Sequence, residues 1–139
     1  MKVLQPSDKS VVLSIDEIHL QQFFDYKGGS VVGAASNSKE AAKSAFAFMI
    51  SSIVFMYKDV VHVLPTCSIN DEELFSLIRK TIRGLEEAGF RVISVIAENN
   101  AVNRKAMSFF TVPPKLSFVY PNPCDVSRSL FSCSIPRTF

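Results

Sequence analysis

Two acidic residues, Asp16 and Glu98, stand at the carboxyl ends of short apolar segments, residues 11–16 (VVLSID) and 91–97 (RVISVIA), whose composition is typical of buried strands. If these strands are parallel neighbours, both carboxylates lie at the edge where open α/β sheets usually bind ligands. Paired carboxylates can hold Mg²⁺ or Mn²⁺, and two such ions about 3.5–4 Å apart promote phosphoryl transfer. The alternative is that both acids merely end their strands at the surface.

The faces of the two strands follow from the alternation of side chains along a strand. Side chains two, four or six positions before an acid are expected on the same face of the strand as that acid. These are Val12 and Ser14 for Asp16, and Val92, Ser94 and Ile96 for Glu98. The two carboxylates then meet only if the strands are neighbours in one sheet.

Local patterns indicate the elements that must position the acids. Further extended segments are expected over 18–25, 30–35, 44–56 and 60–64, with possible short strands over 116–120 and 129–133. Turns are expected at Tyr26–Gly29, where glycine tolerates positive φ, and at Lys58–Asp59, and Pro65 is expected to end a strand. Residues 37–43 are interpreted as a loop or one helical turn. The apolar run 44–56 is assigned to a strand, because a turn and a clear strand follow it.

The clearest element is a helix that starts after Asn70. Asn70 is an N-cap candidate, and Glu73 three residues later completes a capping-box-like pair. Acidic residues crowd the first turn, where the helix dipole favours anions. Apolar residues recur at helical spacing, at Leu74, Leu77, Ile78, Ile82, Leu85 and Ala88. Gly89 then occupies the position where a glycine commonly ends a helix.

A second, shorter helix is expected from Asn99 or Asn100 to about Phe110, before Pro113–Pro114. The order of elements is therefore strand, hairpin, strand, strand, helix, strand, helix. A strand–helix–strand crossover is right-handed and implies a parallel pair of strands. The predicted fold class is α/β, with a mixed sheet whose antiparallel strands precede a parallel one.

The composition indicates one folded domain. The chain has 139 residues and 15.4 kDa, with 47% hydrophobic and 20% charged residues, which excludes a disordered chain. Its net charge of +2 is too small to indicate nucleic-acid binding by itself. With no signal-peptide pattern and no apolar run of about 20 residues, a soluble intracellular protein without membrane contact is expected. The cysteines lack metal-binding spacing and are expected to be small buried side chains: Cys67, Cys124 and Cys133.

Three longer segments form an ordered series of motifs. They are residues 13–35 (LSIDEIHLQQFFDYKGGSVVGAA), 45–64 (AFAFMISSIVFMYKDVVHVL) and 70–104 (NDEELFSLIRKTIRGLEEAGFRVISVIAENNAVNR), the last with an Asn-Arg pair after the second acid. In this order they resemble the start of the catalytic domain of P-element and THAP-domain transposases, over residues 11–110. The resemblance implies an RNase H-like fold and metal-dependent DNA strand cleavage and transfer, with Mg²⁺ or Mn²⁺, DNA as partner and a nuclear location.

The resemblance also implies roles for the two acids. Asp16 occupies the family's first catalytic, metal-binding position, and Glu98 stands where the family usually has its second Asp. The additional methylene of Glu98 shifts its carboxylate by more than the roughly 0.5 Å that a working site tolerates. Residues 118–121 (FVYP) match a Phe-x-x-Pro stretch, but the acid-His-Lys-Asn motif that follows it in the family, the last catalytic acid and the THAP zinc finger are missing.

The chain is therefore expected to be a catalytically incomplete, truncated N-terminal half of such a domain. Residues 1–10 would be an N-terminal tail, 11–110 the RNase H-like part, and 111–139 its Pro- and Ser-rich continuation. One alternative is a domesticated, non-catalytic DNA- or protein-binding module. Another is an unrelated small α/β domain with a ligand site at its strand ends.

Basic residues near these elements allow two interpretations. Arg79, Lys80 and Arg83 are typical of a solvated helix face, and the alternative is contact with DNA phosphates. Arg104 and Lys105 follow Glu98 closely, where they could steer a phosphate backbone. The remaining candidates are interpreted as incidental histidines, His19 and His62, and as core aromatics, including Phe23, Phe46, Phe48, Phe109 and Phe110.

Overall fold

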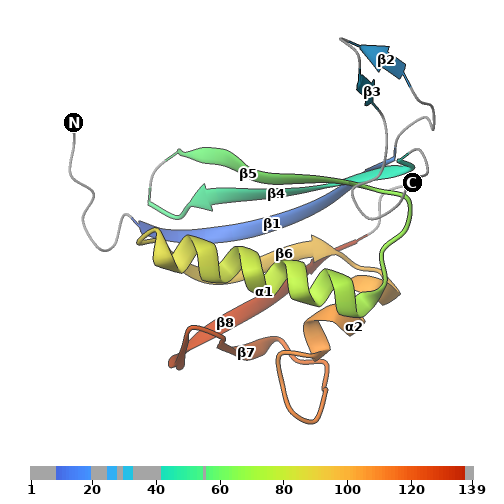
Figure 1. Ribbon diagram of the computed structural model, residues 1–139. Coiled ribbons are helices and arrows are strands. Elements are labelled where there is room, and N and C mark those ends of the chain that lie inside the picture. Colours follow the sequence, from blue (N-terminus) through green and yellow to red (C-terminus); the bar gives the residue numbers. More distant parts are fainter. Residues whose placement is uncertain (1–8, 20–24, 28–29, 33–41, 55, 137–139) are drawn as a thin grey trace.

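The computed structural model describes residues 9–19, 25–27, 30–32, 42–54 and 56–136 (Figure 1). Its strands and helices are β1 (Ser10–His19), β2 (Asp25–Lys27), β3 (Ser30–Val32), β4 (Ser44–Ser52), β5 (Lys58–Thr66), α1 (Asp71–Glu87), β6 (Arg91–Glu98), α2 (Ala101–Ser108), β7 (Val119–Asn122) and β8 (Asp125–Ile135). β2 and β3 form a separate two-stranded hairpin, and the other strands form one six-stranded sheet.

The sheet has the order β5-β4-β1-β6-β8-β7. β1, β4 and β5 are successive antiparallel neighbours, whereas β6 is parallel to β1 and β8 is parallel to β6. The edge strand β7 returns antiparallel to β8. This mixed sheet confirms the predicted order of antiparallel strands, then a helix and a parallel strand.

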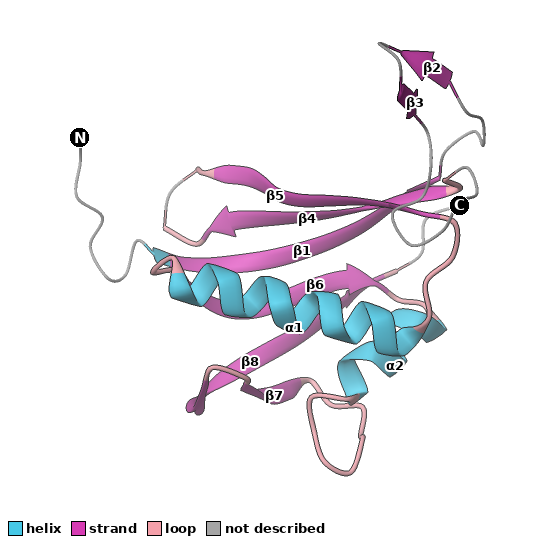
Figure 2. Cartoon of the chain, viewed as in Figure 1, coloured by secondary structure: helices cyan, strands magenta, loops and turns pink. Residues whose placement is uncertain are grey.

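Both helices lie on one face of the sheet, in front of it in Figure 2, and α2 packs beside α1. Most of the predicted apolar stripe of α1 is buried, with Leu74, Ile78, Ile82 and Leu85 between 0% and 7% exposed. Leu77 is half-buried, and Ala88 is exposed at the C-cap. The four buried side chains form one core cluster with alternate residues of β1, with Phe48 of β4, and with residues of β6, α2, β7 and β8. The opposite face of the sheet carries no helix among the described residues.

The predicted ends of α1 are confirmed. The Oδ1 atom of Asn70 accepts a hydrogen bond from the backbone N of Glu73 at 2.8 Å, and its Nδ2 atom donates to the Glu73 Oε1 atom at 3.0 Å. At the other end Ala88 is the C-cap, and Gly89 has a φ of +100°. A side chain rarely adopts this conformation, so the glycine is required by the backbone that turns from α1 into β6.

The predictions around β5 are wrong in two respects. Lys58 and Asp59 were expected in a turn, but they begin β5 and pair with Ser51 and Ile50. Pro65 was expected to end the strand, but β5 continues to Thr66. Among the described strands β5 lies at the edge of the sheet, a position where proline, which lacks an N–H for the ladder, is tolerated.

The carboxyl-terminal region is more regular than its Pro- and Ser-rich composition indicates. The predicted short strands 116–120 and 129–133 correspond to β7 and to an 11-residue β8, and β8 extends the sheet beside β6. α2 ends at Ser108, earlier than the predicted Phe110. The predicted turn at Tyr26–Gly29 falls at the β2–β3 hairpin, and the glycines of this turn lie outside the described residues.

The predicted burial of the cysteines is also wrong. Cys67 is half-buried, whereas Cys124 and Cys133 are exposed. Cys124 lies in the turn between β7 and β8, and Cys133 lies beside Ile96 on the helix-free face of the sheet. Among the described residues, no helix has the length and apolar character needed to traverse a lipid bilayer.

Candidate metal site at the ends of two parallel strands

The structure brings Asp16 and Glu98 together. They lie on β1 and β6, which are adjacent parallel strands, and the register pairs the preceding residues, Ile15 and Ala97. Glu98 ends β6, as expected, but Asp16 does not end its strand, because β1 continues to His19 along β4. Asp16 lies instead where the pairing of β1 with β6 ends, on a backbone about 4.8 Å from that of Glu98. Asp16 is exposed and Glu98 is half-buried.

The two acids also point to the same side of the sheet. Val11, Leu13 and Ile15 of β1 are buried in the core below α1, so Asp16 points to the helix-free face. On β6, Ala97 is likewise buried in that core, and Glu98 points to the helix-free face. Both side chains therefore belong to the helix-free face of the sheet.

One predicted neighbour of Glu98 is wrong. Val92 was expected on the Glu98 face, but it is 0% exposed and belongs to the core on the helix side. The register shifts between the pairs Val11–Val92 and Val12–Ser94, so β6 contains one additional residue there. Such a bulge reverses the alternation of side chains on one side of it. Ser94 remains on the same face as Glu98.

An open groove of about 820 Å³ contains both acids. Its walls come from β1, β4 and β6 and from the end of β8, where Ile135 and Pro136 contribute. A smaller hollow of about 370 Å³ shares Glu17, His19 and Glu98 with it and reaches the first turn of α2. The acids therefore line a surface large enough for an extended ligand.

The residues present fit a hard divalent cation that keeps part of its own coordination shell. Mg²⁺ is commonly bound by one or two carboxylates, with water and substrate phosphates as the remaining ligands. Asp16 and Glu98 supply two carboxylates beside an open groove. Within the described part of the chain, no group of three or more His, Cys, Asp or Glu side chains could hold a metal ion. The site therefore fits Mg²⁺ or Mn²⁺ and does not fit a closed structural zinc site.

The end of β6 is tied to α2 by side-chain amides. The Oδ1 atom of Asn100 accepts a hydrogen bond from the backbone N of Asn103 at 2.9 Å, which confirms Asn100 as the N-cap of α2. The Nδ2 atom of Asn103 donates to the backbone carbonyl of Glu98 at 2.8 Å. Sequence reasoning noted Asn103 only as part of an Asn-Arg pair. The sequence held one signal for this contact: Asn103 is a polar residue in the first turn of an amphipathic helix, five positions after the candidate ligand Glu98.

The basic residues close to Glu98 have partners within the protein. Lys105 Nζ lies 3.0 Å from Asp71 Oδ2, and the NH1 atom of Arg104 donates to Asn99 Oδ1 at 2.7 Å. The hydrogen bond from Lys105 is the main cause that lowers the pKa of Asp71. The predicted steering of a phosphate backbone by Arg104 and Lys105 stays a prediction.

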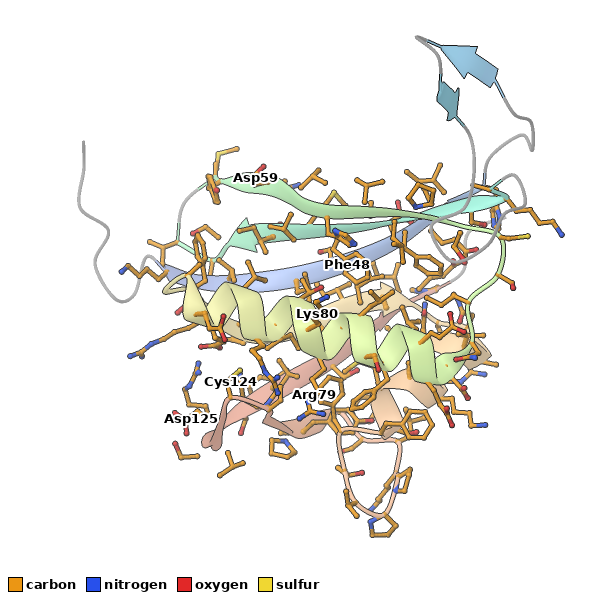
Figure 3. All side chains as sticks on the ribbon, in the orientation of Figure 1. Phe48, Asp59, Arg79, Lys80, Cys124 and Asp125 are labelled. Atoms are coloured by element: carbon orange, nitrogen blue, oxygen red, sulfur yellow. The ribbon has the colours of Figure 1, made fainter. Side chains whose placement is uncertain are left out.

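The basic residues of α1 are exposed on the opposite side of the molecule. Arg79 and Lys80 extend from the helix that covers the other face of the sheet (Figure 3), and Arg83 is also exposed. They therefore do not border the groove that contains Asp16 and Glu98.

The histidines and the described aromatic residues contact other side chains of the protein. The His19 Nδ1 atom lies 3.4 Å from Ser44 Oγ, and the His62 ring lies 5.9 Å from that of Phe48. Phe46 and Phe48 are 3% and 0% exposed, which confirms them as core residues. A chain of ring contacts joins Phe75, Phe109, Phe110 and Tyr120. Phe23 lies outside the described residues.

The mixed sheet, in which antiparallel strands precede a helix and a parallel strand, is the arrangement that the resemblance to an RNase H-like domain implied. Residues 1–111 match the model of the family described as TNP-like, RNase H N-terminal domain. The chain belongs to this family. A search among curated proteins found no match.

A similar solved structure supports the same fold. The Drosophila P element transposase strand transfer complex contains a chain that matches with a TM-score of 0.73 and 17% sequence identity. The match covers 96% of this chain and 28% of that chain, so the chain spans about a quarter of the length of the transposase it resembles. The predicted RNase H-like fold and the predicted relation to P-element-type transposases are confirmed.

Proposed function

We propose that Asp16 and Glu98 hold a divalent cation, Mg²⁺ or Mn²⁺, as part of a centre for DNA strand cleavage and transfer. The observation that carries this proposal is that Asp16 and Glu98 lie on one face, where the pairing of the parallel strands β1 and β6 ends, and line one open groove. Transposases with an RNase H-like domain generally use divalent metals, and membership of the family supports the same chemistry here.

The chain's own residues would hold the cation and leave room for a phosphodiester. Asp16 and Glu98 provide carboxylate oxygens from two rigid strands, and the open groove admits a DNA backbone whose phosphate oxygens complete the coordination. When bound, such a cation activates water and stabilises the leaving oxygen of a phosphodiester. DNA is therefore the proposed partner, and the nucleus is the proposed location, because the strand transfer reaction acts on chromosomal DNA.

We further propose that this chain by itself does not cut DNA. Two carboxylates are fewer than the three or four acids that the resemblance implies. Glu98 also places its carboxylate one methylene farther from the backbone than an aspartate would. A displacement of about 1 Å can lower a rate roughly 10²-fold. The chain would thus retain cation binding while lacking a complete catalytic centre.

Mn²⁺ binding tests the proposed site. Titration of the chain with Mn²⁺, followed by the electron paramagnetic resonance signal of the free ion, is expected to show binding that Asp16→Asn weakens by more than about 10-fold. Loss of a residue that only hydrogen-bonds to a metal ligand typically lowers the metal affinity about 10–100-fold, and Asp16 is proposed as a direct ligand. Asp59→Asn is the matched control, because Asp59 is an exposed aspartate at the start of β5 and outside the groove (Figure 3).

A plasmid nicking assay tests the catalytic part of the proposal. The wild-type chain is expected to leave supercoiled DNA intact in Mg²⁺ and in Mn²⁺. Metal-dependent nicking that Asp16→Asn abolishes would show that the chain is catalytically complete. Equal Mn²⁺ affinity in the wild type, Asp16→Asn and Asp59→Asn would show that Asp16 does not bind the cation.

A further inference from the structure

Asn103 is a buried amide at the start of α2. Its side chain is on the third residue of the helix, and the residue is 8% exposed. The Nδ2 atom donates a hydrogen bond of 2.8 Å to the backbone carbonyl of Glu98. The same carbonyl oxygen accepts a second hydrogen bond, of 3.0 Å, from the backbone N of Asn100.

Neither capping nor helix propensity explains why residue 103 is an asparagine. The N-cap role is already filled by Asn100, whose Oδ1 atom accepts from the backbone N of Asn103. Asparagine has a lower helix propensity than alanine or leucine, and burial of its amide is unfavourable unless the amide is hydrogen-bonded. The hydrogen bond to the Glu98 carbonyl is the interaction that compensates for both effects.

The peptide after Glu98 is held from two sides. α2 holds the Glu98 carbonyl through Asn103, and on the other side the backbone N of Asn99 donates to the carbonyl of Ile135 in β8 at 2.8 Å. The bond to Ile135 belongs to the pairing of Glu98 with Ile135 at the end of the β6–β8 ladder, and the Asn103 bond adds a contact from α2 at the same peptide. The two bonds together restrain the backbone that carries the Glu98 side chain.

We infer that Asn103 is a positioning residue for Glu98, which aims the Glu98 carboxylate at the cation shared with Asp16. This inference rests on the proposed metal site. Glutamate has one more rotatable bond than aspartate, so its carboxylate depends more strongly on a fixed backbone. A working site tolerates displacement of about 0.5 Å.

Two substitutions test this role. Asn103→Leu keeps a side chain branched at the same carbon and removes the donor, and Asn103→Ala removes the donor without adding volume at this buried position. Both are expected to weaken Mn²⁺ binding by about 10-fold, at the lower end of the range for residues that support metal ligands. Both are also expected to speed amide hydrogen exchange at Asn100, whose N–H shares the Glu98 carbonyl. The exchange measurement needs no metal.

Asn100→Ala is the matched control. It removes the N-cap of α2 and leaves the Asn103 side chain, so it separates helix stability from the tether to Glu98. It is expected to lower the melting temperature and to keep the Mn²⁺ affinity within about 2-fold of the wild type.

The outcomes separate this inference from the proposed function. Wild-type Mn²⁺ binding that Asp16→Asn abolishes, together with unchanged binding in Asn103→Leu and Asn103→Ala, would overturn the positioning role alone. Equal losses in Asn100→Ala and Asn103→Ala would also overturn it, since helix stability would then explain both. Absence of Mn²⁺ binding in the wild type would overturn the metal site, and the positioning role with it.

Discussion

Replacement of Glu86 by alanine is expected to lower the free energy of unfolding by about 3 kcal/mol. Glu86, near the end of α1, joins three parts of the fold through its carboxylate. Its Oε1 atom accepts hydrogen bonds from the backbone N of Val92 at 3.0 Å and from Asn122 Nδ2 at 3.2 Å. Its Oε2 atom accepts from the NH2 atom of Arg128 at 2.7 Å. The carboxylate thus fastens β6 and the β7–β8 hairpin to α1.

The magnitude follows from burial and from the partners that remain. The side chains of Glu86 and Arg128 are 12% and 28% exposed, so the ion pair is largely shielded from water. Breaking a buried pair by removal of one partner typically costs about 3–5 kcal/mol. The lower end of this range is expected for Glu86→Ala, because two contacts of the former partners remain. Arg128 keeps its 3.2 Å contact with Asp125, and Asn122 keeps its hydrogen bond to the Val92 carbonyl. The hydrogen bond with Glu86 is also the main cause that raises the pKa of Arg128.

Urea unfolding at 25 °C measures this effect. Glu87→Ala is the control, because Glu87 is the exposed neighbour on the same helix, and its replacement should change stability by less than about 0.5 kcal/mol. Glu86→Gln keeps an acceptor oxygen and is expected to lie between the control and Glu86→Ala. A loss below about 1 kcal/mol in Glu86→Ala would refute the assignment of Glu86 as the junction between α1, β6 and the β7–β8 hairpin.

Two further predictions concern α1. Gly89→Ala is expected to cost about 1 kcal/mol in urea unfolding, because φ is +100° there. Within the described part of the chain, the nearest atom to a new Cβ would be Lys9 Nζ, at 3.6 Å, which is an ordinary contact. An unchanged stability would contradict the left-handed backbone at Gly89. The pKa of Asp71 is lowered chiefly by Lys105, so an NMR titration of its carboxyl should give a midpoint below the usual value for aspartate that rises in Lys105→Ala. Ionised Asp71 stabilises the fold at pH values above its unfolded-state pKa, and this stabilisation is lost as the pH falls through its folded-state pKa. Equal midpoints in the wild type and in Lys105→Ala would rule out the contribution of Lys105.

Local patterns were sufficient for several elements. The N-cap Asn70, the terminal Gly89 and most of the apolar stripe of α1 were predicted correctly, because each depends on residues within a few positions of one another. The strands that carry Asp16 and Glu98 were predicted from their β-branched composition. The intervening helix implied a parallel pair but not which strands form it, so the pairing of β1 with β6 was only a condition that the structure fulfils.

Other features depend on contacts that no local pattern contains. Pro65 was expected to end β5, and only the position of that strand at the sheet edge makes proline acceptable within it. Cys133 was expected to be buried, but it lies on the helix-free face of β8, which the sequence did not place beside β6. The carboxylate of Glu86 looked like one charge among several on an amphipathic helix until its partners 36 and 42 positions away were known.

The amino-acid sequence by itself determined the class of fold, the two candidate acids and the end of β6 at Glu98, because strand and helix periodicity and capping act over a few residues. Only the tertiary structure decided which face each side chain occupies and what holds it there. The bulge that moves Val92 to the helix side and the amide of Asn103 that ties Glu98 to α2 both arise from pairing between distant segments. Such pairing is settled by the packing of the whole sheet, since a shift of one residue exchanges the faces of a strand.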